Sequence, residues 1–264
     1  MKRAGVGEEI RPPARRGNTE GLTRQRGAAP RGNIPSQASS KERLSSRGTA
    51  SGPVSFMRGA DASAGTIKSG GATRRAAKMV VLDIDHPDIE EFIETKAREE
   101  DKIRALSAAG FDMGIGGKDV NSVQYQNANN SVRVSDDFMD AGEKGEKFGL
   151  RARTTDKIIE EVDARDLFGK VAKAAWECAD PGIQFDDTIN SWHTSANTGR
   201  INASNPCSEY MSLDNSSCNL ASLNLLRFLD EDVFDIDKFR RAVALVITAM
   251  AISICFALVP CEAL

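Results

Sequence analysis

Patterns typical of metal sites and disulfide frameworks are missing from this sequence of 264 residues. It has only two histidines, and its five cysteines form no Cys-x-x-Cys pair. Structural zinc sites usually combine such pairs with further cysteine or histidine ligands, and secreted disulfide proteins usually carry an even number of cysteines. We therefore expect no metal site and a reducing, cytoplasmic environment. The cysteines are Cys178, Cys207, Cys218, Cys255 and Cys261.

A strong net charge is also absent, since the formal charge is -3. This value gives no reason to expect nucleic acid as a partner. Residues 1–38 differ from the rest because they are basic, rich in glycine and proline, and poor in large apolar side chains. We expect a disordered tail that is either a basic arm for an anionic partner or a plain solvated extension. The lack of interleaved aromatic residues favours the extension. No apolar run near the start suggests a secretory signal.

A β-α-β alternation begins the second region, residues 39–264. Residues 76–84 form an apolar run typical of a buried strand, and residues 89–98 follow with a helical apolar pattern. His86-Pro87-Asp88 stands before the helix as its expected entry turn and cap. A second strand is expected around residues 130–134. This order favours a parallel α/β sheet or barrel.

Two longer segments have other patterns. Residues 110–130 are rich in glycine and asparagine, which predicts a long loop that is either functional or simply mobile. Residues 157–179 carry two amphipathic helical patterns interrupted near Asp163, with Val171, Ala175 and Trp176 on one predicted core face.

An amide, a thiol and a carboxylate stand at i, i+2 and i+4 in residues 205–209, as Asn205, Cys207 and Glu209. Pro206 disfavours a helix interior, so the segment should be extended or looped. In an extended segment alternate side chains point to the same side, and these three could converge on one small substrate. Cys218 follows eleven residues after Cys207.

The Asn-x-Cys-x-Glu pattern, followed by Cys-Asn-Leu-Ala-Ser-Leu-Asn-Leu at residues 218–225, resembles the active-site loop of ribonucleotide reductase large subunits. Residues 51–57, 70–79 and 129–134 resemble the class II, adenosylcobalamin-dependent enzymes, in the family's order. The resemblance runs from about residue 39 to residue 256. It implies a ten-stranded α/β barrel with the cysteine on a loop inserted into its centre.

The resemblance also implies a role for each residue of the loop. A thiyl radical on Cys207 abstracts the 3′ hydrogen of a ribonucleotide, Glu209 takes the 3′ hydroxyl proton, and Asn205 holds the substrate. Pro206 and Ser208 complete the substrate-binding segment, and Cys218 is one half of the dithiol that supplies two electrons. A sulfur able to carry a radical, a base and an orienting amide are the groups that this chemistry needs.

By the same resemblance, the cofactor is adenosylcobalamin and the external reductant is a dithiol such as thioredoxin. The substrate is a ribonucleoside diphosphate or triphosphate, and a deoxynucleotide effector acts through two loops. Residues 39–51 match part of the first loop, and residues 116–130 match the second, which contains Gly117, Lys118, Gln124 and Asn130. A homodimer is compatible with the family.

Parts of the family pattern are missing from the chain. No cysteine precedes Cys178, although the family places the partner of Cys218 well upstream. The later barrel strands and a C-terminal cysteine pair are also absent. We therefore expect an internal fragment with a partial barrel that cannot complete a turnover alone.

The apolar run at residues 242–259 is long enough to reach the membrane-spanning range, but a core helix is the favoured interpretation. Two alternatives to the enzyme fragment stay open. One is a non-catalytic nucleotide-binding or subunit-interaction fragment of the same fold. The other is a membrane- or nucleic-acid-associated remnant that uses the basic tail and the apolar run.

Overall fold

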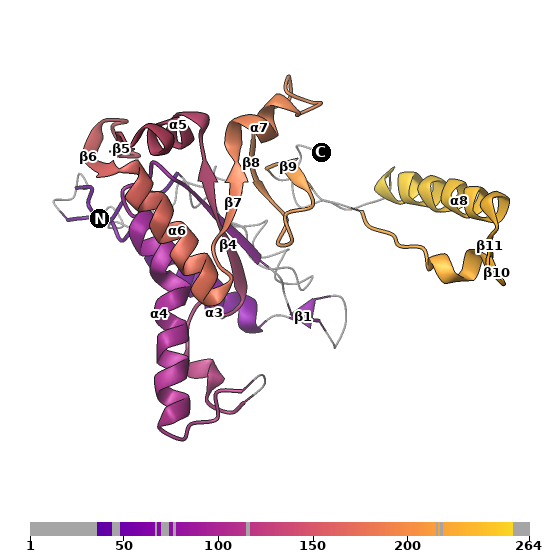
Figure 1. The fold of residues 1–264 in the computed structure, drawn as a ribbon, viewed down its shortest axis with the longest axis horizontal. Helices are drawn as coiled ribbons and strands as arrows, with labels where there is room; N and C mark the ends of the chain where they lie inside the picture. Colours follow the sequence, from indigo (N-terminus) through magenta and orange to yellow (C-terminus); the bar gives the residue numbers. More distant parts are fainter. Residues whose placement is uncertain are drawn as a thin grey trace, which may run out of the picture. The chain divides into compact units, whose positions relative to one another are not determined.

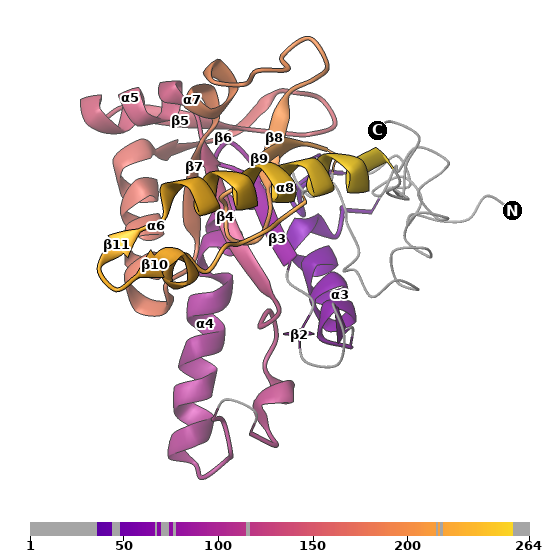
Figure 2. The same cartoon turned by 90° about the vertical axis from the view of Figure 1, so that its right-hand side faces the viewer.

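The computed structural model describes residues 36–43, 48–66, 68–69, 74–75, 78–114, 117–214, 216 and 219–255. The predicted tail at residues 1–38 lies almost entirely outside this part. The chain divides into two units, Met1–Asp214 and Asn215–Leu264, and each is described by itself. Figure 1 and Figure 2 show the helices and strands from two directions.

A parallel three-stranded sheet forms the centre of the first unit, in the order β3 (Lys78–Asp83), β4 (Ala128–Val134) and β7 (Gly182–Phe185). The register places Val80 opposite Asn130 and Val132 opposite Ile183. Helix α4 (Ile89–Ala108) connects β3 to β4. The predicted β-α-β unit is therefore confirmed, although the helix continues about ten residues beyond the expected end.

Helices α4 and α6 (Ala164–Cys178) cover one face of this sheet, as Figures 1 and 2 show from two sides. Their apolar stripes meet alternate residues of β3 and β4 in a single core. Each large apolar side chain buried there contributes about 1.5–3 kcal/mol relative to exposure. The core includes Val80, Leu82, Ile89, Phe92, Ile93, Val132, Val134, Phe138, Leu167 and Val171.

The remaining elements of the first unit connect or flank this sheet. Two sequence-based expectations for the first unit are wrong. Residues 158–163 form a strand that pairs antiparallel with Lys147–Arg151, not a helix, and Trp176 is 86% exposed instead of lying in the core. The elements are α3 (Gly52–Thr66), β1 (Lys68–Ser69), β2 (Arg74–Arg75), η1 (Val120–Ser122), α5 (Asp136–Lys144), β5 (Lys147–Arg151), β6 (Ile158–Asp163), α7 (Asp186–Ser191), β8 (Ile201–Ser204) and β9 (Met211–Leu213).

The turn before α4 also holds the first described segment of the chain. His86 is fully buried, with its Nδ1 accepting from the Asp88 backbone N–H at 3.0 Å, which confirms its place in the entry turn. The Asp88 carboxylate accepts from Ser39 Oγ at 2.7 Å and from the Ser40 backbone N–H at 2.8 Å. It makes no side-chain cap to the helix. Asp88 thus joins two distant segments instead of capping α4 as expected.

Glu42 joins the same first segment to the β5–β6 turn. Its carboxylate accepts from the backbone N–H groups of Ser39, Arg153 and Thr154 at 2.8–2.9 Å and from the Thr154 hydroxyl at 2.5 Å. Burial acts to raise the pKa of Glu42, but these hydrogen bonds outweigh it and hold the pKa below its usual value.

Lys78 is an unusual residue at the start of β3. The residue is 9% exposed, and its Nζ has no hydrogen-bond partner in the part of the chain that the structure describes. Burial lowers the pKa of Lys78 to about 8, although the negative charge of Asp61 opposes the change.

The second unit contains η2 (Leu225–Phe228), β10 (Leu229–Asp230), β11 (Val233–Phe234) and helix α8 (Ile236–Cys255). The rings of Phe228 and Phe239 pack edge to face at 5.3 Å between centroids. Asn219 Nδ2 donates to Ser253 Oγ at 2.6 Å and joins the incoming chain to α8. No helix within the described ranges, α8 included, has the length and apolarity needed to cross a membrane.

The α/β class is confirmed, but the ten-stranded barrel is not. In the described ranges the largest sheet has three strands and the other sheets have two, so no closed barrel is present there. A barrel needs every strand to have two neighbours, and β3 and β7 each have one among the strands that the structure describes.

Candidate active site

The predicted catalytic segment is the turn of the β8–β9 hairpin. The two strands pair antiparallel, with Ser204 opposite Met211. Within the turn, the Ser208 backbone N–H donates to Asn205 O at 3.0 Å, and the Asn205 side-chain oxygen accepts from the Tyr210 backbone N–H at 3.0 Å. Ser208 has a φ of 63°, in the left-handed region. The segment is therefore looped and not extended.

The turn removes the reason for which the three side chains were predicted to point to one side. Strand alternation does not apply to residues 205–209, so it cannot place Asn205, Cys207 and Glu209 on one side. The turn instead leaves Cys207 and Glu209 exposed, whereas Asn205 is half-buried. Cys207 carries a free thiol. The hairpin thus presents a thiol and a carboxylate two residues apart at its end.

Arg133 holds the base of the hairpin. Its guanidinium, on β4, is almost fully buried and pairs with Asp186 at the start of α7. It also donates to Gln184 Oε1 on β7 at 3.3 Å and to Ile201 O on β8 at 2.5 Å. Asp186 pairs in addition with Arg200. Burial lowers the pKa of Arg133, and the surrounding carboxylates, Asp83 first, oppose this effect.

Two amides hold the hairpin further along. Gln184 Nε2 donates to Ser204 Oγ at 2.8 Å, at the last residue of β8. Asn129 Nδ2, on β4, donates to Pro206 O at 2.7 Å, inside the turn itself. Asn129 and Arg133 share one face of β4 because side chains alternate along a strand. The hairpin therefore lies against the sheet face opposite α4 and α6.

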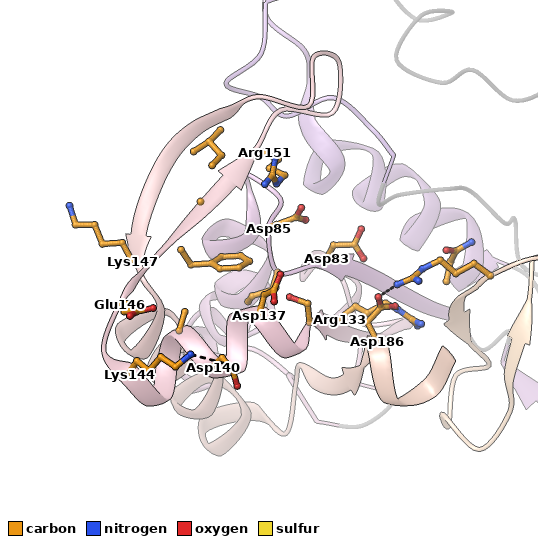
Figure 3. A pocket seen from close by; sticks show the side chains of 18 residues that line it. Asp83, Asp85, Arg133, Asp137, Asp140, Lys144, Glu146, Lys147, Arg151 and Asp186 are labelled. Carbon is orange, nitrogen blue, oxygen red and sulfur yellow. Dashed lines mark hydrogen bonds and ion pairs between the residues drawn. The ribbon is translucent and has the colours of Figure 1, made fainter. Parts of the chain in front are cut away.

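A polar cavity of about 640 Å³ lies at the carboxyl ends of the parallel strands. Figure 3 shows Asp83 and Asp85 from the end of β3 near Arg133 and Asp186. Burial raises the pKa of the Asp83 carboxyl, and Arg153 only partly counteracts this. Carboxyl ends of parallel strands are the usual ligand-binding edge of such sheets. The cavity borders the base of the hairpin through Arg133 and Asp186.

The residues predicted to bind an effector do not contact this hairpin in the described part of the chain. Cys218 lies outside the described residues. Lys118 and Gln124 are exposed in the connection before β4, where the Lys118 backbone N–H donates to Asp112 at 3.2 Å and Gly117 packs closely on the same aspartate. Asn130 is buried inside β4, which confirms the strand expected around residues 130–134, and it does not lie in an exposed part of the loop that the resemblance implies at residues 116–130. Effector binding by these residues stays a prediction.

The chain matches the family described as "Ribonucleotide reductase, barrel domain" over residues 36–264. It belongs to this ribonucleotide reductase family. The chain is 68% identical over 248 residues to the "Vitamin B12-dependent ribonucleotide reductase" of Streptomyces clavuligerus, covering 92% of this chain and 26% of that protein. It is 51% identical over 227 residues to the protein of the same name from Rhodopirellula baltica, covering 85% and 22%.

A third relative of the ribonucleotide reductase family is the "Vitamin B12-dependent ribonucleoside-diphosphate reductase" of Thermoplasma acidophilum. It is 38% identical over 200 residues, covering 75% of this chain and 23% of that protein. The chain thus spans about a quarter of the length of the curated relatives it matches.

The residues that hold the hairpin were missed at the level of sequence. Arg133 and Gln184 stand between apolar neighbours in short strands, and the spacing of four residues between Asn129 and Arg133 along β4 was an available signal. Polar side chains at alternate positions of a buried strand need partners. The partner segment, however, is 77 residues from Asn129, 68 from Arg133 and 20 from Gln184 in sequence, and it has no pattern that reveals it.

Proposed function

We propose that this chain carries the reaction loop of a vitamin B12-dependent ribonucleotide reductase and acts in reducing ribonucleotides to 2′-deoxyribonucleotides. The observation that carries the proposal is the β8–β9 hairpin, whose turn exposes the Cys207 thiol and the Glu209 carboxylate. The family membership and the names of the relatives support the same chemistry.

Each group of the turn has a distinct role in the proposed reaction. The sulfur of Cys207 carries a radical and removes the 3′ hydrogen of the ribose, and Glu209 accepts the 3′ hydroxyl proton. The Asn205 amide orients the substrate, and Pro206 and Ser208 shape the loop around it. The 2′ hydroxyl then leaves as water while a dithiol is oxidised to a disulfide and supplies two electrons. We assign one of these thiols to Cys218.

The exposed thiol of Cys207 is the group of the first unit that fits the chemistry of a cobalamin cofactor. Within the described ranges, no group of three or more histidine, cysteine, aspartate or glutamate side chains could hold a bare metal ion. A cofactor that brings its cobalt already ligated needs no such group, and the exposed Cys207 thiol is the protein group with which it would react. When bound, adenosylcobalamin supplies the one-electron oxidation that makes the thiol a radical.

Further parts of the proposal concern the longer protein. We place the parallel sheet in a ten-stranded barrel that other segments would close, in a cytoplasmic enzyme. The substrate is a ribonucleoside diphosphate or triphosphate, and the name of the Thermoplasma relative supports the diphosphate. A deoxynucleotide effector, a homodimer and a dithiol reductant such as thioredoxin complete the system.

A chimaera tests this proposal, because the chain spans only a quarter of its relatives. Residues 36–264 replace the matching segment of the Streptomyces clavuligerus enzyme, and deoxynucleotide formation is measured anaerobically with adenosylcobalamin and dithiothreitol. We expect activity that falls by at least a thousandfold in Cys207→Ser, because a hydroxyl cannot replace the radical-carrying sulfur. Cys178→Ala, which removes a half-buried thiol of α6, is the matched control and should stay active.

Two results would contradict the proposal. One is full activity in Cys207→Ser. The other is a folded chimaera that binds nucleotide without reducing it, which would favour the non-catalytic alternative.

A further inference from the structure

The shape of the turn that carries Cys207 is set by its own hydrogen bonds. Asn205 accepts from the backbone N–H groups of Ser208 and Tyr210 through its carbonyl and its side-chain oxygen. The left-handed φ of Ser208 completes the reversal. These contacts determine the form of the turn, but they do not determine where it sits on the sheet. Its position depends on contacts with the strands beneath.

Three polar side chains of the sheet contact the hairpin at successive points from its base to its turn. Arg133 holds the base at Ile201 O, and Gln184, its register partner on β7, holds Ser204 Oγ. Asn129 holds the turn at Pro206 O. Asn129 and Arg133 are four residues apart in β4, which is about 13 Å along the strand. Asn129 therefore acts far from the buried base of the hairpin.

The contact of Asn129 bears directly on Cys207. The Pro206 carbonyl oxygen and the Cys207 backbone nitrogen belong to one peptide group, and a peptide group is planar. A hydrogen bond of 2.7 Å to that oxygen therefore fixes the orientation of the plane that leads into Cys207. Rotation of this plane would swing the Cys207 Cα and move the thiol.

We propose that Asn129 is a positioning residue for the Cys207 thiol, an inference that rests on the proposed function. It acts through the Pro206–Cys207 peptide and does not touch the reacting atoms. Its loss should therefore lower kcat with little effect on KM. A displacement of about 1 Å in a reacting group lowers rates by up to about a hundredfold.

The chimaera provides the test. Asn129→Ala removes the amide, and Asn129→Asp keeps the size but replaces the donor with a carboxylate that would repel the carbonyl oxygen. We expect kcat to fall by about ten- to a hundredfold in both, with KM within twofold of the parent. Lys157→Ala is the control, because this exposed side chain lies in the β5–β6 turn, outside the hairpin and outside both loops matched to effector binding.

A second measurement does not depend on turnover. The rate of Cys207 alkylation by iodoacetamide, measured by peptide mass spectrometry and normalised to Cys255, should change by at least threefold in both Asn129 variants and not in Lys157→Ala. An unchanged rate at Cys207 overturns the inference even if the chimaera is inactive. In an active, Cys207-dependent chimaera, an unchanged kcat overturns it and leaves the proposed function intact.

Discussion

The buried lysine at the start of β3 gives a prediction with a defined pH dependence. Lys78 is 9% exposed, and its Nζ makes no hydrogen bond within the described residues. An ammonium group in this position loses its hydration and gains only the attraction of Asp61. We expect Lys78→Met to stabilise the chain at neutral pH, because methionine fills similar space without a charge.

The pKa of Lys78 sets the sign and size of the effect. The pKa is about 8 in the folded chain, against 10.5 for an unperturbed lysine. Between these values the unfolded chain binds a proton that the folded chain has released, so the free energy of unfolding rises with pH. The difference of about 2.5 pKa units corresponds to at most about 3.4 kcal/mol. Below pH 8 the lysine is charged in both states, and the full destabilisation is present.

Urea unfolding of the wild type and the variant from pH 6 to pH 11 measures this difference. Lys78→Met should be more stable by about 2–3 kcal/mol below pH 8, and the gap should close as the pH approaches 10.5. Lys157→Met, at an exposed position in the β5–β6 turn, is the matched control and should show no such trend. A variant that is less stable at pH 7, or a gap that does not change with pH, would refute the reasoning.

Two further predictions concern charged groups that join distant segments. Arg133→Met should lower the free energy of unfolding by about 2–3 kcal/mol. This is less than the usual 3–5 kcal/mol for a broken buried ion pair, because Asp186 keeps its ion pair with Arg200. Urea unfolding measures the change, and a loss under 1 kcal/mol would argue against a structural role. Glu42→Gln should destabilise by about 1–2 kcal/mol at pH 7. Since the pKa of Glu42 is lowered, this stabilisation is present above the unfolded value of 4.5 and is lost as the pH falls through the folded pKa, so the difference between wild type and variant should narrow as the pH is lowered below 4.5.

The central sheet could be predicted from sequence because its signals are local. The apolar run of β3 and the stripe of α4 each have the period of one structure. The prediction of a helix at Ile158–Asp163 was wrong because the six-residue run Ile-Ile-Glu-Glu-Val-Asp fits the period of a helix or of a strand. Its pairing with β5 makes it a strand. The prediction for Trp176 was wrong because the buried face of α6 contains Leu167, Val171 and Ala174, and Trp176 lies two residues beyond Ala174, about 200° around the helix.

The sequence predicts candidate residues for the site, but it does not predict the form of the segment that carries them. Pro206 excludes a helix but does not distinguish a strand from a turn, and the left-handed Ser208 and the Asn205 side-chain hydrogen bond give the turn. The supporting contacts of Asn129 and Arg133 depend on tertiary structure across about 70 residues. The catalytic roles of Asn205, Cys207 and Glu209 stay predictions.

The order of segments along the chain has a consequence for biosynthesis. Strands β4 and β7, which supply Asn129, Arg133 and Gln184, come before β8 and β9 in the sequence. A ribosome adds residues from the N-terminus, and earlier segments can fold while later ones are still being made. The sheet and its two covering helices can therefore assemble first, so that the newly emerging cysteine hairpin meets a finished docking surface.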